Sequence, residues 1–132
     1  MTRIVAGSAK GRTLAVPKSG TRPTSERVRE ALLSRLDHMN VLDGATVLDL
    51  YAGTGALGLE ALSRGGAHAT LVEKAPAAAR VAAANVRSTG LPARVVTADA
   101  RTYLGARNGE ALAGDIDLVF IDPPYDIAEE DM

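Results

Sequence analysis

The chain has 132 residues, of which 46% are apolar and 23% charged, as expected for one globular domain with a core of its own. Its net charge is −1, and it has no Cys, which excludes a disulfide framework and thiolate metal sites. Its apolar runs are shorter than the roughly 20 residues that cross a bilayer, and the N-terminus lacks the apolar segment of a signal peptide. We therefore expect a cytoplasmic protein without a metal, in which the isolated His38 and His68 lie on the surface.

The net charge conceals an uneven distribution along the chain. Residues 1–40 carry eight Lys or Arg and three Asp or Glu, whereas residues 41–132 carry seven basic and thirteen acidic residues. A basic segment on an acidic body indicates a polyanionic partner, because each cation that meets a phosphate releases a counterion. A solvated charged segment is the alternative, and charge alone favours that alternative.

The first forty residues predict a β-hairpin followed by a helix. Residues 2–7 and 12–16 are typical of two short strands, and residues 8–11 form a plausible hairpin loop. Thr24 or Ser25 can cap the helix that follows. Its apolar residues recur near helical spacing and should face the body of the protein: Val28, Ala31, Leu32, Leu36 and Met39.

From about residue 45 the pattern alternates between strands and helices. We predict buried strands over 46–50, 70–72, 94–97 and 117–121, and helices over 56–64, 76–88 and 100–107. Near-continuous apolar strands between helices are typical of a parallel, doubly wound α/β sheet. Such a sheet with a nucleotide site normally has further strands, so we expect this sheet to be C-terminally incomplete.

A glycine-rich loop joins the first of these strands to its helix. Gly53, Gly55 and Gly58 match G-x-G-x-x-G, the dinucleotide fingerprint, and Glu73 lies where an acid would bind ribose hydroxyls. A NAD-dependent oxidoreductase must therefore be considered. Asp49 argues against it, because a carboxylate at the strand end would repel a pyrophosphate docked on the helix N-terminus.

A ligand that carries positive charge and no phosphate suits this loop better. S-adenosylmethionine carries positive charge on an ammonium and a sulfonium. Its ribose hydroxyls could bind Glu73, and its adenine amino group could donate a hydrogen bond to Asp99. Gly53 and Gly55 would let the backbone approach it closely. Asp99 could instead simply cap the helix that follows it. However, acids lie at the ends of four strands in succession, and four separate structural explanations would be needed if none of them bound a ligand: Asp49, Glu73, Asp99 and Asp122.

The sequence Asp122-Pro123-Pro124-Tyr125 directly follows the last apolar run. Ligands bind at this end of a strand in open α/β sheets. Asp122 and the carbonyl of Pro123 can accept the hydrogens of an exocyclic amine, the two prolines fix the backbone, and Tyr125 can stack on a base. We predict that these four residues are catalytic, and the alternative is a loop that merely follows a strand.

These motifs resemble those of the Rossmann-like class I methyltransferases and, more narrowly, the bacterial 16S rRNA guanine-N2 methyltransferase D family. The narrower resemblance rests on Arg3-Ile4-Val5-Ala6-Gly7, on Lys10-Gly11-Arg12, and on Arg22-Pro23-Thr24 running into residues 27–32. It covers nearly the whole chain. The glycine loop and Asp-Pro-Pro-Tyr are signals of the wider class, which DNA adenine methyltransferases share. The family's sheet has seven strands, of which this chain supplies about four.

The resemblance implies transfer of a methyl group from S-adenosylmethionine to N2 of a guanine in 16S rRNA, within an assembling small ribosomal subunit, by a monomer. Residues 1–40 would be an RNA-binding hairpin and helix, and residues 41–132 the methyltransferase core. The resemblance and the loop chemistry together predict these cofactor-binding residues: Asp49, Tyr51, Gly53, Thr54, Gly55, Glu73, Lys74, Asp99, Ala100 and Asp122. Phosphates of the rRNA would bind a cationic set: Arg3, Lys10, Arg12, Lys18 and Arg22. Three alternatives stay open: a DNA adenine-N6 methyltransferase, a NAD-binding oxidoreductase domain, and a nucleotide-binding or RNA-binding module without catalysis.

Overall fold

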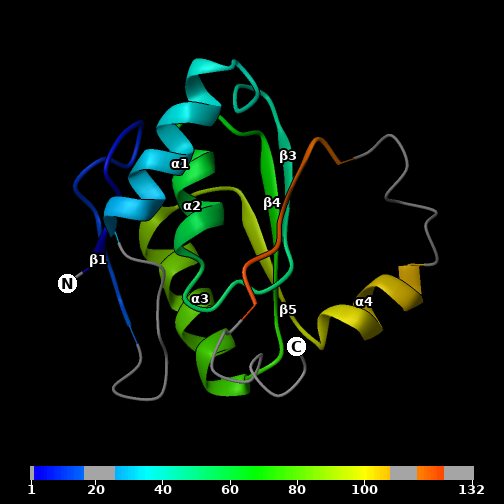
Figure 1. Ribbon diagram of the computed structural model, residues 1–132. Helices are drawn as coiled ribbons and strands as arrows, with labels where there is room; N and C mark the ends of the chain where they lie inside the picture. The colour runs from blue at the N-terminus through cyan, green and yellow to red at the C-terminus, as the bar shows by residue number, and fades with distance from the viewer. Residues whose placement is uncertain (1, 17–25, 108–115, 124–132) are drawn as a thin grey trace.

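The computed structural model describes residues 2–16, 26–107 and 116–123. Within these residues the chain forms a small antiparallel hairpin and a parallel sheet with helices on both faces (Figure 1). The elements are β1 (Thr2–Arg3), β2 (Thr13–Leu14), α1 (Glu26–His38), β3 (Thr46–Asp49), α2 (Ala56–Ser63), β4 (His68–Glu73), α3 (Pro76–Thr89), β5 (Ala93–Thr97), α4 (Ala100–Arg107) and β6 (Leu118–Phe120). The predicted hairpin, the predicted helix after it and the alternation of strands and helices are confirmed.

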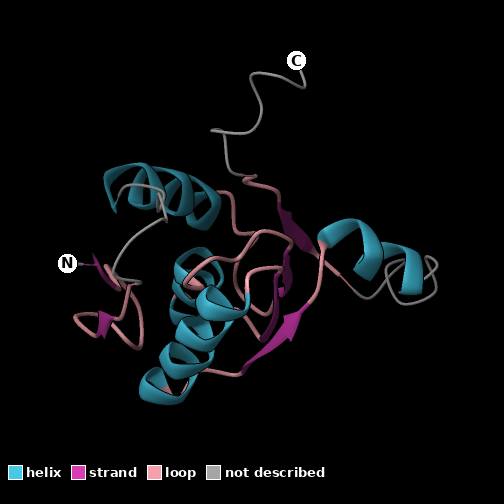
Figure 2. Cartoon of the chain, turned by 90° about the horizontal axis from the view of Figure 1, so that it is seen from below, coloured by secondary structure: helices cyan, strands magenta, loops and turns pink. Residues whose placement is uncertain are grey.

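The parallel sheet has the strand order β5-β4-β3-β6. Val47 of β3 lies opposite Ala69 of β4 on one side and opposite Leu118 of β6 on the other. Helices α1, α2 and α3 lie on one side of the sheet and α4 on the other, as Figures 1 and 2 show from two directions. From β3 the chain adds β4 and then β5 on one side, and it returns to add β6 on the other side of β3. The place between β3 and β6 where the direction reverses is called a switch point. Sheets of this kind bind ligands there, at the carboxyl ends of the strands.

Local sequence signals explain where the helices begin and end. Helix α3 starts with Pro76, whose fixed φ suits the first helical position, and it ends at Gly90, which adopts the left-handed conformation with φ 70°. Helix α2 begins after Gly55 and ends at Ser63, shortly before Gly65-Gly66, where glycine ends a helix readily. Within the described part of the chain, the helices are too short or too polar to cross a membrane.

The sheet separates two clusters of buried apolar side chains. The larger cluster lies on the side of α2 and α3 and includes Ile4, Leu14, Leu33, Val47, Leu59 and Leu71. The smaller cluster lies beneath α4 and includes Leu48, Leu50, Val72, Ala100 and Tyr103. Because the hairpin and α1 supply residues to the larger cluster, the two segments predicted as separate domains share one core. Their division by function, into RNA binding and cofactor binding, stays a prediction.

Polar contacts from α2 hold the hairpin loop. Glu60 is fully buried, and its two carboxylate oxygens accept hydrogen bonds from the N–H groups of Val5 and Ala6 at 2.9 and 3.0 Å. The Oγ of Ser63 accepts the N–H of Ala9 at 2.9 Å and donates to the carbonyl of Ala6. The loop that follows β1 is therefore part of the fold and not a loose extension.

The predicted buried face of α1 is wrong for most of its residues, although Leu36 does pack against the core. Val28 and Met39 are 56% and 60% exposed, whereas Arg29 and Leu33 are buried. The reason is the pairing of Arg29, whose guanidinium donates to the carbonyl of Arg3 and lies 3.7 Å from a carboxylate oxygen of Glu60. A charged side chain can be buried when it has such partners.

The predicted continuous burial of the last strand is also wrong. Phe120 is buried, but Val119 and Ile121 are 43% and 65% exposed. Successive side chains of a strand point to opposite faces of the sheet, so Val119 and Ile121 lie on the face opposite to Phe120. β6 is an end strand of the sheet that the described residues form, and α4, the described helix on the face of Val119, packs mainly against β4.

Candidate functional site

Four acidic residues gather at the carboxyl edge of the parallel sheet. Asp49 and Glu73 are the last residues of β3 and β4, and Asp99 and Asp122 lie two residues beyond the ends of β5 and β6. Because parallel strands end at the same edge, these residues belong to one crevice. The switch point between β3 and β6 lies between Asp49 and Asp122. The four acids predicted at the strand ends therefore share one edge of the sheet.

Asp49 has the most unusual environment of the four. Its side chain is buried, and neither carboxylate oxygen has a hydrogen-bond partner. Burial raises the pKa of Asp49 from 3.8 to about 7, and the negative charges of Asp122 and Glu73 add to the rise. The N–H groups of Tyr51 and Gly58 oppose this rise in pKa, although neither reaches the geometry of a hydrogen bond.

A buried carboxylate without a partner is a costly arrangement for a folding chain. Its charge can be stabilised there by a cation that enters the crevice from solvent. The ammonium and sulfonium of S-adenosylmethionine would meet this need, whereas a pyrophosphate would be repelled. The observed environment of Asp49 therefore fits the cofactor predicted from the sequence.

Glu73 fixes the conformation of the glycine loop. Its Oε1 accepts the N–H of Gly53 at 2.7 Å, and its Oε2 accepts the N–H of Ala75 at 2.9 Å. The N–H of Gly53 is thus directed at a carboxylate and not outward toward a phosphate. Each oxygen of Glu73 keeps a lone pair that could accept a ribose hydroxyl.

The glycines of the loop have different surroundings. At Gly53, whose φ is 56°, an added Cβ would meet nothing within 4 Å, so the space beside this backbone is open. At Gly55, whose φ is 87°, the same atom would lie 3.1 Å from Leu71. Gly53 thus leaves room for close approach of a ligand, whereas Gly55 also serves the packing of α2 on the sheet. Beside them Tyr51 is 39% exposed and Thr54 is buried.

The third acid has a structural partner of its own. Oδ2 of Asp99 accepts the N–H groups of Arg101 and Thr102 at 3.1 and 3.2 Å, so Asp99 caps α4. This helix cap was the alternative explanation for Asp99. The cap uses only Oδ2, so Oδ1 could still accept a hydrogen bond from an adenine amino group. Ala100 is the first residue of α4 and is buried against the sheet, and Lys74, which follows β4, is exposed.

The predicted catalytic residues are only partly described. Asp122 and Pro123 are half-buried, and Asp122 lies close enough to Asp49 to influence its pKa. Pro124 and Tyr125 lie outside the described residues. The structure thus brings Asp122 together with the glycine loop.

The predicted RNA-binding residues divide in the same way. Arg3, Lys10 and Arg12 are exposed on the hairpin, while Lys18 and Arg22 lie outside the described residues. Arg12 also donates to the carbonyl of Ser88 at 3.2 Å, which ties its side chain to the end of α3.

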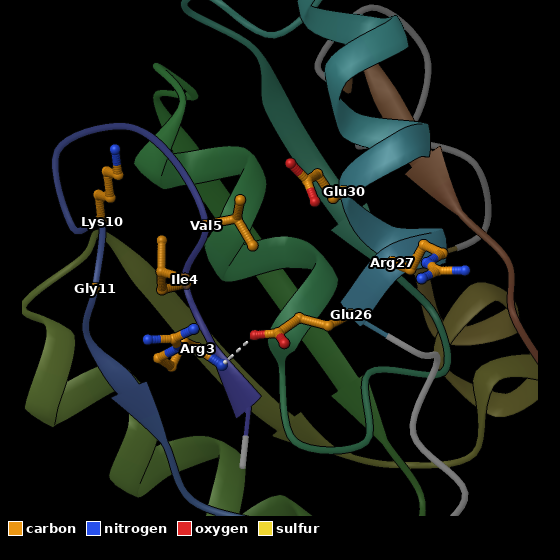
Figure 3. Close-up of a pocket in the computed structure, with 8 residues that line it drawn as sticks. All are labelled: Arg3, Ile4, Val5, Lys10, Gly11, Glu26, Arg27 and Glu30. Atoms are coloured by element: carbon orange, nitrogen blue, oxygen red, sulfur yellow. Dashed lines mark hydrogen bonds between the residues drawn. The ribbon is translucent and has the colours of Figure 1, made fainter.

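A cavity of about 380 Å³ lies between the hairpin and the start of α1. Figure 3 shows Glu26 and Glu30 reaching from α1 toward the hairpin, which carries Arg3 and Lys10. Glu26 accepts the N–H of Arg3 at 3.1 Å. Arg27 lines the same cavity and was not among the predicted RNA-binding residues, although its place at the start of a helix in the basic segment was a usable signal. Arg29, in contrast, is buried and cannot reach a phosphate.

Across residues 2–16, 26–107 and 116–123, no group of three or more His, Cys, Asp and Glu side chains could hold a metal ion.

The strand order, the glycine loop and the acids at the strand ends define the fold of the Rossmann-like class I methyltransferases. The solved structure described as a putative methyltransferase from Escherichia coli has this fold, with a TM-score of 0.76 at 40% identity over 92% of this chain and 63% of that chain. The chain belongs to the family described as Conserved hypothetical protein 95, whose model matches residues 2–131. The resemblance and the α/β class expected from the motifs are confirmed.

Two relatives illustrate the breadth of the match. Ribosomal RNA small subunit methyltransferase D of Escherichia coli strain K12 is 42% identical over 125 residues, which are 93% of this chain and 60% of that protein. The solved structure of a hypothetical protein of Thermus thermophilus matches with a TM-score of 0.81 at 40% identity, over 96% of this chain and 71% of that chain. The chain spans about 60% of the length of the first curated relatives it matches.

Proposed function

We propose that this protein transfers a methyl group from S-adenosylmethionine to N2 of a guanine in 16S rRNA, within an assembling small ribosomal subunit in the cytoplasm. The observation that carries the proposal is the buried, unpartnered carboxylate of Asp49 at the switch point of the sheet. The Escherichia coli relative, named as a ribosomal RNA small subunit methyltransferase, supports the choice of acceptor.

The cofactor would lie across the ends of β3, β4 and β5. Asp49 would attract its positive charge, Glu73 would accept its ribose hydroxyls, and Asp99 with Ala100 would bind its adenine. Tyr51, Gly53, Thr54, Gly55 and Lys74 would form the walls of the site. When bound, S-adenosylmethionine supplies the methyl group from its sulfonium. The hydrogen bond between Gly53 and Glu73 fixes the loop before the ligand arrives, which reduces the entropy lost on binding.

The guanine would be held by the segment that follows β6. Asp122 and the carbonyl of Pro123 would accept the two hydrogens of the amine, which favours a pyramidal nitrogen with a localised lone pair. Placing that nitrogen ~3–3.5 Å from the methyl carbon supplies much of the rate. The bond between methyl and sulfur would break as the bond to nitrogen forms. The methylated nitrogen would lose its proton to Asp122 or to water only after the transfer, so Asp122 need not be a strong base. A base within a helix is out of reach, so the guanine would be flipped out or unpaired, with Tyr125 stacked on it beyond Pro124.

The hairpin would bind the rRNA backbone. Arg3, Lys10 and Arg12 are exposed, and Lys18 and Arg22 belong to the same basic segment. Phosphate contacts of this kind give affinity and orientation and do not choose the base. The selection of one guanine would come from the shape of the particle around it.

Calorimetric titration with S-adenosylmethionine, with NAD as the comparison ligand, tests the cofactor. We expect binding of S-adenosylmethionine alone, and weaker binding by Asp49→Asn. The matched control is Asp43→Asn, which removes the same charge from an exposed position. Binding of NAD alone would overturn the proposal, and so would equal affinity in the wild type and Asp49→Asn.

Transfer of a labelled methyl group tests the reaction. Small subunits that lack the modification are compared with duplex DNA, and the Escherichia coli relative serves as the positive control. We expect N2-methylguanosine in digested 16S rRNA, and near-complete loss of transfer in Asp122→Ala with cofactor binding mostly kept. Labelled adenine in DNA, labelled rRNA at another atom, or full turnover by Asp122→Ala would contradict the proposal.

A further inference from the structure

Asn85 is a buried residue of α3 whose side chain joins two distant segments. Its Nδ2 donates to the carbonyl of Thr54 at 2.9 Å and to the carbonyl of Ala15 at 3.1 Å. Its Oδ1 accepts the N–H of Ala15 at 2.7 Å. Both donors and the acceptor are thus used, and the three partners together determine the orientation of the amide.

The two segments belong to different parts of the proposed function. Thr54 lies between Gly53 and Gly55 in the loop proposed to hold the cofactor. Ala15 directly follows β2 of the hairpin, whose exposed Lys10 and Arg12 are proposed to bind RNA. Asn85 is therefore a direct link between the glycine loop and the proposed RNA-binding hairpin.

A second contact fastens the same part of the hairpin to α3. Arg12, on the other side of β2, donates to the carbonyl of Ser88, one turn along the helix from Asn85. The two flanks of β2 are thus both held by α3. The difference between them is that Arg12 is exposed, whereas Asn85 is 2% exposed and lies out of reach of water.

The burial of Asn85 makes its contacts dependent on one another. If Thr54 or the segment at Ala15 moved alone, the amide would keep one partner and lose the other inside the protein. An unpaired buried polar group is strongly disfavoured, so the two segments move together or not at all. A ligand that holds one of them therefore stabilises the position of the other.

We propose that Asn85 is a positioning residue that couples cofactor binding at the glycine loop to RNA binding by the hairpin segment. The inference rests on the proposed function, since it concerns the same two ligands. By linkage, the cofactor raises the affinity for RNA by the same factor by which RNA raises the affinity for the cofactor. The coupling favours RNA binding by the protein that already carries its methyl donor.

The experiment measures the Kd of S-adenosylmethionine with and without a saturating amount of unmodified small subunits. We expect the ratio of the two values to be about fivefold or more in the wild type, as is usual for coupled sites. In Asn85→Asp the side chain keeps its size and its acceptor for Ala15 but loses both donations, and we expect the ratio to fall to about one. Asn40→Asp is the matched control, because Asn40 is exposed and its left-handed φ of 65° is one that Asp also tolerates.

A second variant separates coupling from damage to the cofactor loop. Ala15→Pro removes the N–H that Asn85 accepts and leaves the contact with Thr54 in place. We expect its affinity for S-adenosylmethionine alone to stay within about twofold of the wild type, while the coupling ratio falls. In turnover, KM for the particle should rise while kcat at saturation is retained, a split that a general loss of structure would not produce.

The outcomes distinguish failure of the proposed function from failure of the coupling through Asn85. Failure of the wild type to bind S-adenosylmethionine or the particle overturns the proposed function, and this inference with it. Binding of both ligands without coupling in the wild type overturns this inference alone. The same holds if both variants keep the wild-type ratio.

Discussion

Asp122 lies near enough to Asp49 for its negative charge to add to the effect of burial and raise the pKa of Asp49. The two residues lie at the ends of neighbouring parallel strands that come far apart in the sequence. In the proposed function, Asp49 binds the methyl donor and Asp122 the acceptor. Their electrostatic contact means that the protonation of Asp49 responds to events on both sides of the crevice.

The raised pKa of Asp49 predicts a pH dependence of stability. Because the folded protein binds this proton more tightly than the unfolded chain, the contribution to stability is complete below about pH 4 and is lost as the pH rises toward 7. Between pH 5 and pH 8 the loss should be roughly 3 kcal/mol. Urea denaturation at both values should show it in the wild type and in Asp43→Asn, but not in Asp49→Asn. Parallel pH profiles for the wild type and Asp49→Asn would contradict this prediction.

The same pKa predicts that cofactor affinity rises with pH. A cationic ligand binds the ionised form of Asp49, so below pH 7 binding must release a proton. The affinity for S-adenosylmethionine should increase up to tenfold per pH unit between pH 5.5 and about 7, and then level off. Titration in buffers of different ionisation enthalpy measures the released proton. In Asp49→Asn the affinity should no longer depend on pH. An equal wild-type affinity at pH 5.5 and pH 8 would show that the charge of Asp49 does not contribute to binding of the ligand.

Removing the charge of Glu60 should loosen the hairpin. Glu60→Gln keeps the shape of the side chain but leaves Arg29 and Arg64 without their buried counter-charge. The expected loss of unfolding free energy is about 3–5 kcal/mol, typical of a broken buried pair. Denaturation and amide exchange at Val5 and Ala6 measure it. Glu30→Gln, an exposed change on α1, should cost little, and an equally small effect of Glu60→Gln would show that the network is not needed.

A pair of glycines tests how tightly the hairpin loop is packed. Gly7 and Gly11 have nearly the same φ, 90° and 88°, so an alanine is strained at either position. At Gly7 the added Cβ would lie 1.8 Å from the carbonyl oxygen of Ser63, whereas at Gly11 it would meet nothing within 4 Å. Gly11→Ala should cost about 1–2 kcal/mol. Gly7→Ala should cost clearly more, and equal melting temperatures for the two variants would refute the contact.

Much of the fold could be predicted because its signals are local. The Pro that starts α3, the Gly that ends it and the apolar runs of β3 and β4 each lie within a few residues of the boundary that they determine. The acids at the strand ends were found in the same way. Their convergence followed from one rule, that parallel strands end at a common edge.

The features that escaped prediction depend on partners far away in the sequence. The burial of Arg29 needs Glu60, which belongs to another helix, and the exposure of Val119 depends on the position of β6 in the strand order. The lack of hydrogen bonds at Asp49 and the three hydrogen bonds of the Asn85 side chain also depend on tertiary structure. No window of local sequence contains them, so a pattern of apolar and polar residues could not reveal them.

The pairing of β3 with two strands has a consequence for the order of folding. Val47 meets Ala69 after one short helix, but it meets Leu118 only after most of the remaining chain has been placed. Closing the longer loop costs more entropy and contacts of long sequence separation form more slowly, so β6 should join the sheet late. During synthesis the glycine loop would thus be assembled before Asp122 arrives beside it. Under the proposed function, the side of the sheet edge that binds the methyl donor would be complete before the side that binds the guanine.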